Sequence, residues 1–172
     1  MTGIEIRRMS PAEAEAFRQI RLEALQRNPE AYGSSFEQES AQPLAWFEDR
    51  LDKADVFGAF RGTELLGIAG YLTQEGLKHK HKGVLWGMYV RPAARNAGVG
   101  RALVEDVLEH AAKRVELTQL CVISANDTAK RLYTRHGFIE YGVEKNALKH
   151  NGCYYDDVLM AKPLTRETHE RR

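Results

Sequence analysis

One stretch decides the fold of this chain: Met88-Tyr89-Val90-Arg91-Pro92-Ala93-Ala94-Arg95-Asn96-Ala97-Gly98-Val99-Gly100-Arg101-Ala102-Leu103. A β-prone run at residues 84–90 stops at a proline, and a short loop then leads through Gly98 and Gly100 into an amphipathic helix. Glycines at the first turn let a bulky anion approach the backbone, and the free N–H groups at the helix N-terminus supply donors for phosphate. Arg95 and Arg101 bracket this turn. The stretch therefore predicts a site for a ligand that carries a pyrophosphate.

Neither of the two best-known phosphate-binding patterns fits this turn. The P-loop requires four residues between its glycines and then Gly-Lys-Ser/Thr, which the chain lacks. The dinucleotide fingerprint needs a third glycine where Leu103 stands, and an acid where Ser124 and Ala125 end the next strand. What remains is Arg-x-x-Gly-x-Gly at residues 95–100, which resembles the acyl-CoA loop of the GNAT superfamily of N-acyltransferases.

A second motif follows at residues 120–138. The apolar run Leu120–Ala125 reads as a strand, and Asn126 is a favoured N-cap residue for the helix that follows. The order Asn-x-x-Ala-x-x-Leu-Tyr-x-x-x-Gly-Phe at residues 126–138 is similar to the second GNAT motif, with Gly137 as the expected stop of the helix. Because two motifs occur in the right order and spacing, the chain is identified as a member of this superfamily.

Size and composition are typical of one soluble domain. The chain has 172 residues, and its 25 Lys and Arg nearly balance its 24 Asp and Glu, so no net charge favours nucleic acid or an anionic membrane. No apolar run approaches transmembrane length and the N-terminus lacks a signal-peptide core, which predicts a cytoplasmic protein. We expect Cys121 and Cys153 to be small buried hydrophobes rather than a disulfide or a metal site.

The rest of the chain alternates between strand and helix signals. Ser10-Pro11 with Glu13 predicts a capping box at the start of the first helix. The expected elements are strand 4–7, a helix to about residue 28, helix 43–53, a hairpin of 56–61 and 65–72, strand 84–90, helix 98–114, a strand ending at 125, a helix ending before 137, and strands 138–143 and 154–160. This order matches the GNAT pattern over residues 4–163. The resemblance implies an α/β (α+β) fold with a mixed central sheet, splayed at the cofactor strand, and helices on both faces. We expect a single domain at residues 1–164 and a polar tail at 165–172.

The resemblance also implies acetyl-CoA as the co-substrate and no metal. In the family the pantetheine arm lies along the strand before the phosphate loop, as an added strand would, and a backbone N–H there stabilises the oxyanion. The residues implied to contact the cofactor are Met88, Tyr89, Val90, Arg95, Asn96, Ala97, Gly98, Val99, Gly100, Arg101, Asn126, Ala129 and Tyr133. Tyr133 is also the implied general acid, because a phenol on the last helix can protonate the departing sulfur.

The general base is where this chain departs from better-known family members. Some carry a Glu on the strand before the phosphate loop, and protein-acetylating relatives use a Glu where this chain has Cys121. We expect Glu39 to serve instead, since its segment lines the acceptor cleft in relatives; a water chain or an amine that arrives neutral would also suffice. Residues 154–157 open the last strand near the expected active site, where they either touch the acceptor or form a surface turn. The residues expected to bind the acceptor are Ser34, Ser35, Glu37 and Trp86.

The sequence thus predicts an N-acetyltransferase that moves an acetyl group from acetyl-CoA to a primary amine within a ternary complex. A small-molecule amine is favoured as acceptor, because the Glu typical of protein-acetylating relatives is missing. The alternatives are acetylation of a protein or peptide at its N-terminus or a lysine, and a non-catalytic CoA-binding regulatory domain. Neither a nucleic acid nor a membrane is an expected partner. The oligomeric state stays open, although a homodimer is common in the family.

Overall fold

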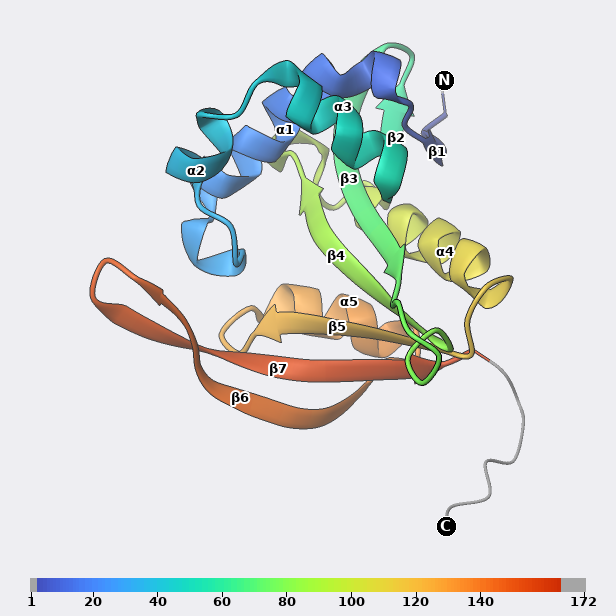
Figure 1. The fold of residues 1–172 in the computed structure, drawn as a ribbon, viewed down its shortest axis with the longest axis vertical. Coiled ribbons are helices and arrows are strands. Elements are labelled where there is room, and N and C mark those ends of the chain that lie inside the picture. The colour runs from blue at the N-terminus through green and yellow to red at the C-terminus, as the bar shows by residue number, and fades with distance from the viewer. Residues whose placement is uncertain (1–2, 165–172) are drawn as a thin grey trace.

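A single mixed sheet organises residues 3–164, which are the part of the chain that the computed structural model describes (Figure 1). The strands in spatial order are β1 (Glu5–Arg8), β2 (Asp55–Arg61), β3 (Glu64–Thr73), β4 (Lys82–Val90), β5 (Leu117–Ile123), β7 (Cys153–Pro163) and β6 (Ile139–His150). Neighbouring strands are antiparallel except β4 and β5, which run parallel. The predicted mixed α/β sheet is confirmed.

The sheet opens between β4 and β5, where the splay was predicted. The two strands pair only from Lys82 to Val84 and then diverge into the V seen in Figure 1, so the rest of the β4 edge has no partner strand on that side. The register of β4 against β3 shifts in this region, and Gly87 has a φ of 63°, a conformation that favours glycine. Such a bulge bends a strand and increases its twist, which helps to separate β4 from β5.

Helices cover both faces of the sheet, as expected. On one face α1 (Ala14–Arg27) and α3 (Leu44–Lys53) pack on β2, β3 and β4, and bury aromatic and aliphatic side chains such as Phe17, Phe47 and Ile68. On the other face α4 (Val99–Ala112) packs on the same strands, and α5 (Asp127–Arg135) packs near β5 and β7. Each face therefore has its own apolar core, and β4 lies between the two cores at the mouth of the V.

Most element boundaries agree with the sequence within a few residues. The capping box at the first helix is present, because the Ser10 N–H donates to Glu13 Oε2 at 2.9 Å. That first turn is a 3-10 helix, η1 (Pro11–Glu13), and two more, η2 (Pro29–Ala31) and η3 (Pro92–Ala94), likewise begin at a proline. The short helix α2 (Phe36–Ser40) was not predicted, since five residues are too few to show a helical period.

The last hairpin is longer than predicted. Strand β6 runs to His150 rather than to Val143, and β7 begins at Cys153. The extra residues of β6 are mostly polar because β6 is an edge strand without a core beneath this part, so they show no hydrophobic alternation. Asn151 and Gly152 form the turn with φ of 49° and 79°, and this Asn-Gly pair is the hairpin signal that the sequence analysis passed over.

The prediction that both cysteines are buried is wrong. Cys121 and Cys153 are free thiols with exposed side chains. In β5, Leu120 and Val122 face the core, and Cys121 lies between them on the opposite face of the strand. Cys153 is at the end of the exposed β6–β7 hairpin. A strand of apolar residues does not show by itself which of its faces is covered.

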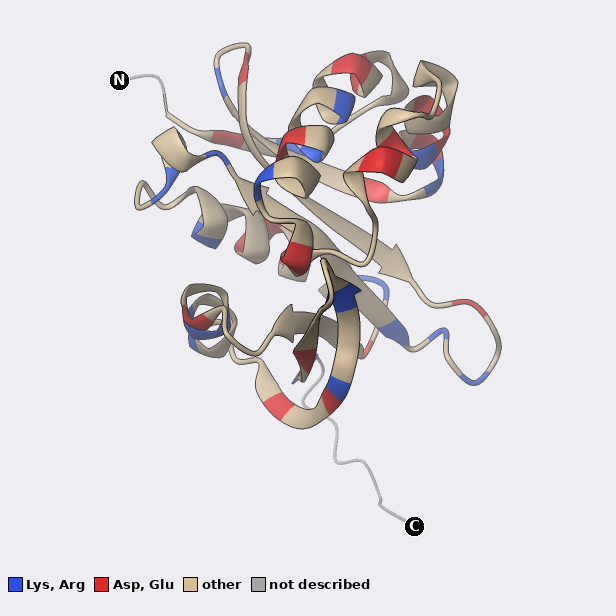
Figure 2. Ribbon diagram, turned by 90° about the vertical axis from the view of Figure 1, so that its left-hand side faces the viewer, with Lys and Arg blue, Asp and Glu red and all other residues tan. Residues whose placement is uncertain are grey.

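Charge and hydropathy add two observations. Figure 2 shows basic and acidic residues interspersed along the helices and loops, as their near-equal numbers suggest. Within residues 3–164, none of the helices is long and apolar enough to cross a membrane. The polar tail predicted at residues 165–172 lies outside the described residues, so that domain boundary remains a prediction.

Candidate functional site

The loop before α4 has the backbone of an anion site. Asn96 and Gly98 have φ of 61° and 80°, and Gly98 is the N-cap residue of the helix. No side chain caps this end and no acid lies in its first turn, so the N–H groups of Val99, Gly100 and Arg101 lack the usual partners. A Cβ added at Gly98 would meet no atom within 4 Å. The helix end therefore offers free donors, a positive dipole and open space to an anion.

The two arginines of this loop are placed differently. Arg95 Nε donates to the Val90 carbonyl at 3.0 Å, and its guanidinium lies 5.8 Å from the centre of the Tyr89 ring. Arg101 is exposed and pairs with Glu105 on the next turn of α4 at 2.8 Å. Arg95 is therefore tied to the end of β4, whereas Arg101 is a solvent-facing charge beside the helix end. Both lie close enough along the chain to the α4 N-terminus to contribute positive charge to it.

Gly100, the second glycine of the loop, has different surroundings from Gly98. A Cβ on Gly100 would lie 3.5 Å from Met88 Cε and 3.5 Å from Leu132 Cδ2, both ordinary contact distances. Gly100 thus faces the place where α4, β4 and α5 approach one another, and Gly98 faces open space. Close approach of a ligand to the backbone depends on Gly98 more than on Gly100.

The open edge of β4 presents Met88 and Val90. The Tyr32 hydroxyl donates to the Met88 carbonyl at 2.9 Å, and Arg95 reaches the Val90 carbonyl, so both carbonyls point away from β3. In a strand the N–H and C=O of one residue point to the same side, so the N–H groups of Met88 and Val90 also face the gap. Tyr89 pairs with β3 instead. Its backbone therefore contributes less to the site than the sequence analysis expected.

Tyr133 is a buried phenol on α5. Its side chain is 5% exposed, and its ring lies edge-on to Phe138 with centroids 5.7 Å apart. Burial, and secondarily the proximity of the Tyr32 hydroxyl, raises the pKa of Tyr133. Among the described residues its hydroxyl has no hydrogen-bond partner. A protonated, unpaired phenol is suited to donate a proton to a ligand atom.

Asn126 caps α5 as predicted. Its side-chain oxygen accepts a hydrogen bond from the Ala129 N–H at 3.1 Å. The cap fixes the start of the helix whose face carries Leu132 and Tyr133. The second sequence motif is therefore explained locally, by a capped helix that positions one phenol.

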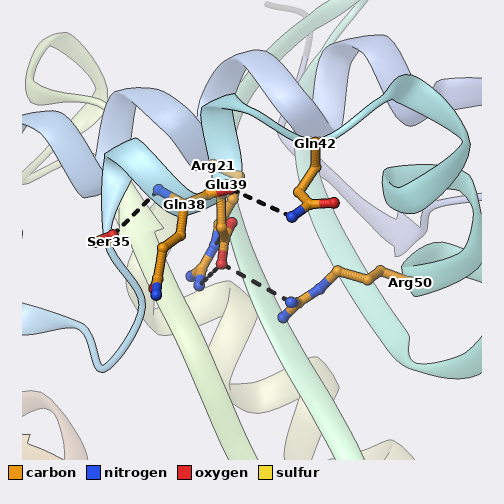
Figure 3. A network of polar contacts seen from close by, with 6 residues as sticks. All are labelled: Arg21, Ser35, Gln38, Glu39, Gln42 and Arg50. Atoms are coloured by element: carbon orange, nitrogen blue, oxygen red, sulfur yellow. Dashed lines mark hydrogen bonds and ion pairs between the residues drawn. The ribbon is translucent and has the colours of Figure 1, made fainter.

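On the other face of β4, a buried ion pair joins α1 to α2 (Figure 3). Arg21 donates to both carboxylate oxygens of Glu39 at 2.9 Å, and each side chain is 5% exposed. Arg50 on α3 approaches the same carboxylate at 3.8 Å. Burial acts to raise the pKa of Glu39, but hydrogen bonds and charge from Arg21, with help from Ser34 and Arg50, lower it overall.

This geometry makes Glu39 a poor candidate for the general base. Its oxygens are already engaged by Arg21, and its lowered pKa weakens it as a proton acceptor. The sequence analysis took it for an accessible acid because a local pattern gives no sign of a partner 18 residues away. Ser35 caps α2 through the Gln38 N–H at 3.2 Å, and Glu37 is exposed. The predicted acceptor segment is thus held to α1 by Glu39.

Trp86 lies beside this ion pair. Its ring is 5.9 Å from the Arg21 guanidinium and 5.1 Å from that of Arg50. A Cβ at Gly70 on β3 would collide with the indole, so this glycine makes room for the ring. The Trp86 Nε1–H is buried and has no hydrogen-bond partner among the described residues. The indole therefore packs against β3 at Gly70, with the guanidiniums of Arg21 and Arg50 within 6 Å of its ring.

One acid has the environment that Glu39 lacks. Asp157 on β7 is level with Ile123 on β5 and with Glu144 on β6, close to the β5 end that leads to Asn126. Burial first, and the Glu144 charge second, raises its pKa. The sequence named residues 154–157 without ranking them, since burial of a single carboxyl cannot be deduced from a strand pattern.

A family model described as the acetyltransferase (GNAT) family matches residues 15–138. Mycothiol acetyltransferase from Streptomyces scabiei (strain 87.22), a curated relative, is 32% identical over 145 residues, which are 81% of this chain and 44% of that protein. The chain therefore spans less than half of the length of this relative. Among residues 3–164, no three His, Cys, Asp or Glu side chains gather where they could hold a metal ion.

Solved structures agree with the fold. An acetyltransferase of the GNAT family from Streptococcus pneumoniae has a TM-score of 0.83 at 22% identity, covering 94% of this chain and 99% of that one. Ribosomal-protein-alanine N-acetyltransferase from Brucella melitensis has a TM-score of 0.75 at 25% identity, covering 92% and 99%. A Salmonella typhimurium protein described as an acetyltransferase, solved with its cofactor acetyl-CoA, has a TM-score of 0.78 at 19% identity, covering 95% of each chain.

Proposed function

The chain belongs to the GNAT acetyltransferase family, and from this premise we propose that it transfers the acetyl group of acetyl-CoA to a primary amine of a small molecule. One juxtaposition carries the proposal. An added Cβ on Gly100, in the first turn of α4, would lie 3.5 Å from Met88 on β4 and 3.5 Å from Leu132, the neighbour of Tyr133 on α5, so the unpaired β4 edge, the uncapped α4 N-terminus and the helix that carries Tyr133 adjoin one another. Each feature suits one part of acetyl-CoA. The β4 edge suits the extended pantetheine arm with its amides, the α4 N-terminus suits the pyrophosphate, and the Tyr133 phenol suits the leaving sulfur.

The residues fit acetyl-CoA at both ends of the molecule. The N–H groups of Val99, Gly100 and Arg101 hold the pyrophosphate, above the open space at Gly98. Met88 and Val90 bond the pantetheine amides as a neighbouring strand would, and one of their N–H groups stabilises the oxyanion. The co-substrate supplies an activated acetyl group, and the remaining chemistry belongs to the protein.

Two proton transfers complete the reaction. As the amine nitrogen forms its bond to the acetyl carbon and the carbon–sulfur bond breaks, Tyr133 protonates the departing sulfur. Asp157 takes the proton that the amine loses, directly or through water, because its raised pKa brings it nearer to the working range of a base. In this assignment Glu39 positions Arg21 and helix α2 and does not react.

The acceptor distinguishes the proposal from its alternatives. The curated relative is named as a mycothiol acetyltransferase and one solved structure as a ribosomal-protein-alanine N-acetyltransferase, so small molecules and proteins both occur among similar proteins. We favour a small molecule because Cys121 stands where protein-acetylating relatives carry Glu. A non-catalytic CoA-binding domain would have no need of the Tyr133 phenol. A homodimer and a cytoplasmic location stay predictions. For the homodimer, the apolar side chains that edge strand β6 exposes are a candidate contact surface: Ile139, Tyr141 and Val143.

A turnover screen tests the proposal. The release of free CoA thiol from acetyl-CoA is measured with a panel of small amines, peptides with free N-termini and lysine peptides. Small amines should give rates well above the hydrolysis blank. Turnover only with peptides would establish the protein-acetylating alternative, and CoA binding without turnover of any amine would establish the non-catalytic one.

The base is tested separately, by the pH dependence of kcat/KM. With Asp157 as base, kcat/KM should rise with pH through a pKa above the usual aspartate value of about 3.9, and Asp157→Asn should abolish that rise. Glu48→Gln, at an exposed acid on α3, is the control and should leave the profile unchanged. An unaltered pH profile in Asp157→Asn would contradict this assignment. Water would then be the base, or the amine would arrive neutral and need none.

A further inference from the structure

Arg50 is a cation without a partner of its own. Its guanidinium lies between two indoles, 4.6 Å from the Trp46 ring centre and 5.1 Å from that of Trp86, and its side chain is 29% exposed. None of its side-chain N–H groups donates a hydrogen bond to a described residue. The nearest carboxylate oxygen is Glu39 Oε1 at 3.8 Å, which already accepts a hydrogen bond from Arg21 at 2.9 Å. Arg50 thus keeps five donors unused.

The charge around Arg50 is unbalanced. Arg21 and Arg50 share a single carboxylate, Glu39, which leaves about one unit of positive charge on the group. Asp49, the acid one position earlier on α3, is occupied by Lys53 at 2.8 Å. An unsatisfied guanidinium held rigidly against aromatic rings costs little further side-chain entropy when it binds an anion.

Arg50 of α3 and Trp86 of β4 line one cleft. Asp49 and Lys53 of α3 also line it, as do residues 72–75 and 79 from the end of β3 and the connection to β4. Trp86 immediately precedes Gly87, where an added Cβ would lie 3.5 Å from Arg21 Nη1. Trp86 and Met88 lie on either side of the Gly87 bulge in β4. The cleft therefore reaches β4 two residues before Met88, the first strand residue of the proposed acetyl site.

We propose that Arg50, held between Trp46 and Trp86, binds a carboxylate of the acceptor, so that the preferred acceptors are amines that also carry a carboxylate, as amino acids do. The inference rests on the proposed acetyltransferase function. A planar guanidinium fork matches the two oxygens of a carboxylate, which favours this anion as the ligand. The Trp86 Nε1–H is enclosed, so Arg50 is the donor that a ligand meets first.

A binding measurement tests the site without turnover. N-acetylglycine has the form of a product that carries a carboxylate, and N-acetylglycinamide is its neutral match. Both are titrated into the protein with CoA present, and the indole N–H resonances of the two tryptophans are followed by NMR. The Trp86 resonance, assigned with Trp86→Phe, should shift saturably with N-acetylglycine and much less with the amide. Equal responses to both probes would overturn the proposal.

Two variants test whether Arg50 is the residue that binds N-acetylglycine. Arg50→Gln should weaken binding of N-acetylglycine roughly 10- to 100-fold and leave CoA affinity unchanged. Arg18→Gln is the matched control, because Arg18 also stacks on an aromatic ring, that of Phe47 at 5.7 Å, but does not line the cleft. Unchanged N-acetylglycine binding in a folded Arg50→Gln protein would contradict the assignment. If Arg50→Gln does not fold, the comparison of N-acetylglycine with N-acetylglycinamide in the wild-type protein still tests whether the cleft binds a carboxylate.

Kinetics separate this inference from the proposed function. Glycine, β-alanine and γ-aminobutyrate are compared as acceptors with their amides, with acetyl-CoA saturating. At least one acid should have a KM roughly tenfold below that of its amide, and Arg50→Gln should remove the difference without lowering kcat for the amide. Amides used as well as acids would refute the carboxylate site and leave the acetyltransferase intact. If no amine is turned over, but N-acetylglycine still binds the wild-type protein more tightly than Arg50→Gln, the proposed acetyltransferase function is refuted and the carboxylate site at Arg50 is not.

Discussion

The two faces of β4 differ in how their polar groups are satisfied. On the α4 and α5 face the donors come from the backbone, namely the first N–H groups of α4 and the open edge at Met88 and Val90. On the α1 and α3 face they come from side chains, which form the cluster of Arg21, Glu39 and Arg50 against Trp86. The first face is built from loop and helix geometry that any member of the family can share. The second depends on individual side chains, and we assign to it the recognition of the acceptor.

The largest effect should come from the phenol of Tyr133, which α5 carries on the α4 and α5 face. Tyr133→Phe removes only the hydroxyl, so CoA affinity should persist while kcat falls by roughly 10²- to 10⁴-fold, as expected for loss of a positioned general acid. When chemistry limits the rate, kcat and kcat/KM should fall together. Tyr154→Phe, at an exposed phenol on β7, is the control and should have wild-type rates. Retention of more than about a third of wild-type kcat would return Tyr133 to a packing role.

The next effect is on stability and belongs to the side-chain face. Glu39→Ala leaves Arg21 buried without its carboxylate, which should cost about 3–5 kcal/mol of the free energy of unfolding. Urea denaturation measures this loss, and Glu37→Ala, an exposed acid on the same short helix, should change stability by less than about 0.5 kcal/mol. A loss below about 1 kcal/mol for Glu39→Ala would show that the ion pair does not hold α2 to α1.

The same pair predicts a dependence of stability on pH. The pKa of Glu39 is lowered by folding, so its contribution is complete above the pKa of the unfolded chain, about 4.3, and is lost as the pH falls through the folded value. The wild-type protein should therefore lose stability between neutral pH and pH 3 more steeply than Glu39→Gln. Parallel stability curves for the two proteins would mean that Glu39 titrates alike in the folded and unfolded states.

A smaller effect should separate Gly98 from Gly62, two of the glycines with left-handed backbone. Gly98→Val places a side chain in the open space above the α4 N-terminus and should lower CoA affinity roughly tenfold or more, measured by calorimetry. Gly62→Val in the β2–β3 turn is the matched control, because Gly62 has a φ of 59° and equally open surroundings. Both variants should lose similar stability through strain. Equal CoA affinities would place the pyrophosphate elsewhere.

The smallest effect is expected at the exposed charge of the backbone face. Arg101→Ala breaks a solvent-exposed pair with Glu105 and should leave the free energy of unfolding almost unchanged. CoA affinity should fall only a few-fold, about 2- to 5-fold at low salt, and the difference should shrink as salt screens the charge. A salt-independent loss of affinity would indicate a direct, buried contact of Arg101 with phosphate.

The sequence predicted the backbone face well because its signals are local. A glycine-rich turn, an Asn cap and a Gly stop lie within a few residues of the structure that they specify, as Gly98, Asn126 and Gly137 show. The cofactor contacts that the family implies for this face stay predictions, and the backbone of Tyr89 pairs with β3.

The side-chain face could not be predicted in the same way. Arg21 and Glu39 are 18 residues apart and Arg50 is further along, so their contact depends on how three helices pack. Glu39 was accordingly taken for an accessible acid and Cys121 for a buried thiol, because exposure is decided by which face of an element is covered. The length of β6 was missed for the same reason: an edge strand carries polar residues that show no period.

The most direct test of the account is a map of where CoA binds. Backbone amide resonances are assigned and followed by NMR during a titration with CoA. The account predicts the largest shifts at the amides of residues 97–101 and at Met88 and Val90, with small shifts in the β6–β7 hairpin around Asn151. CoA binding that leaves the amides of residues 97–101 and of Met88 and Val90 unmoved would contradict the central claim that the open edge of β4 and the α4 N-terminus form the site.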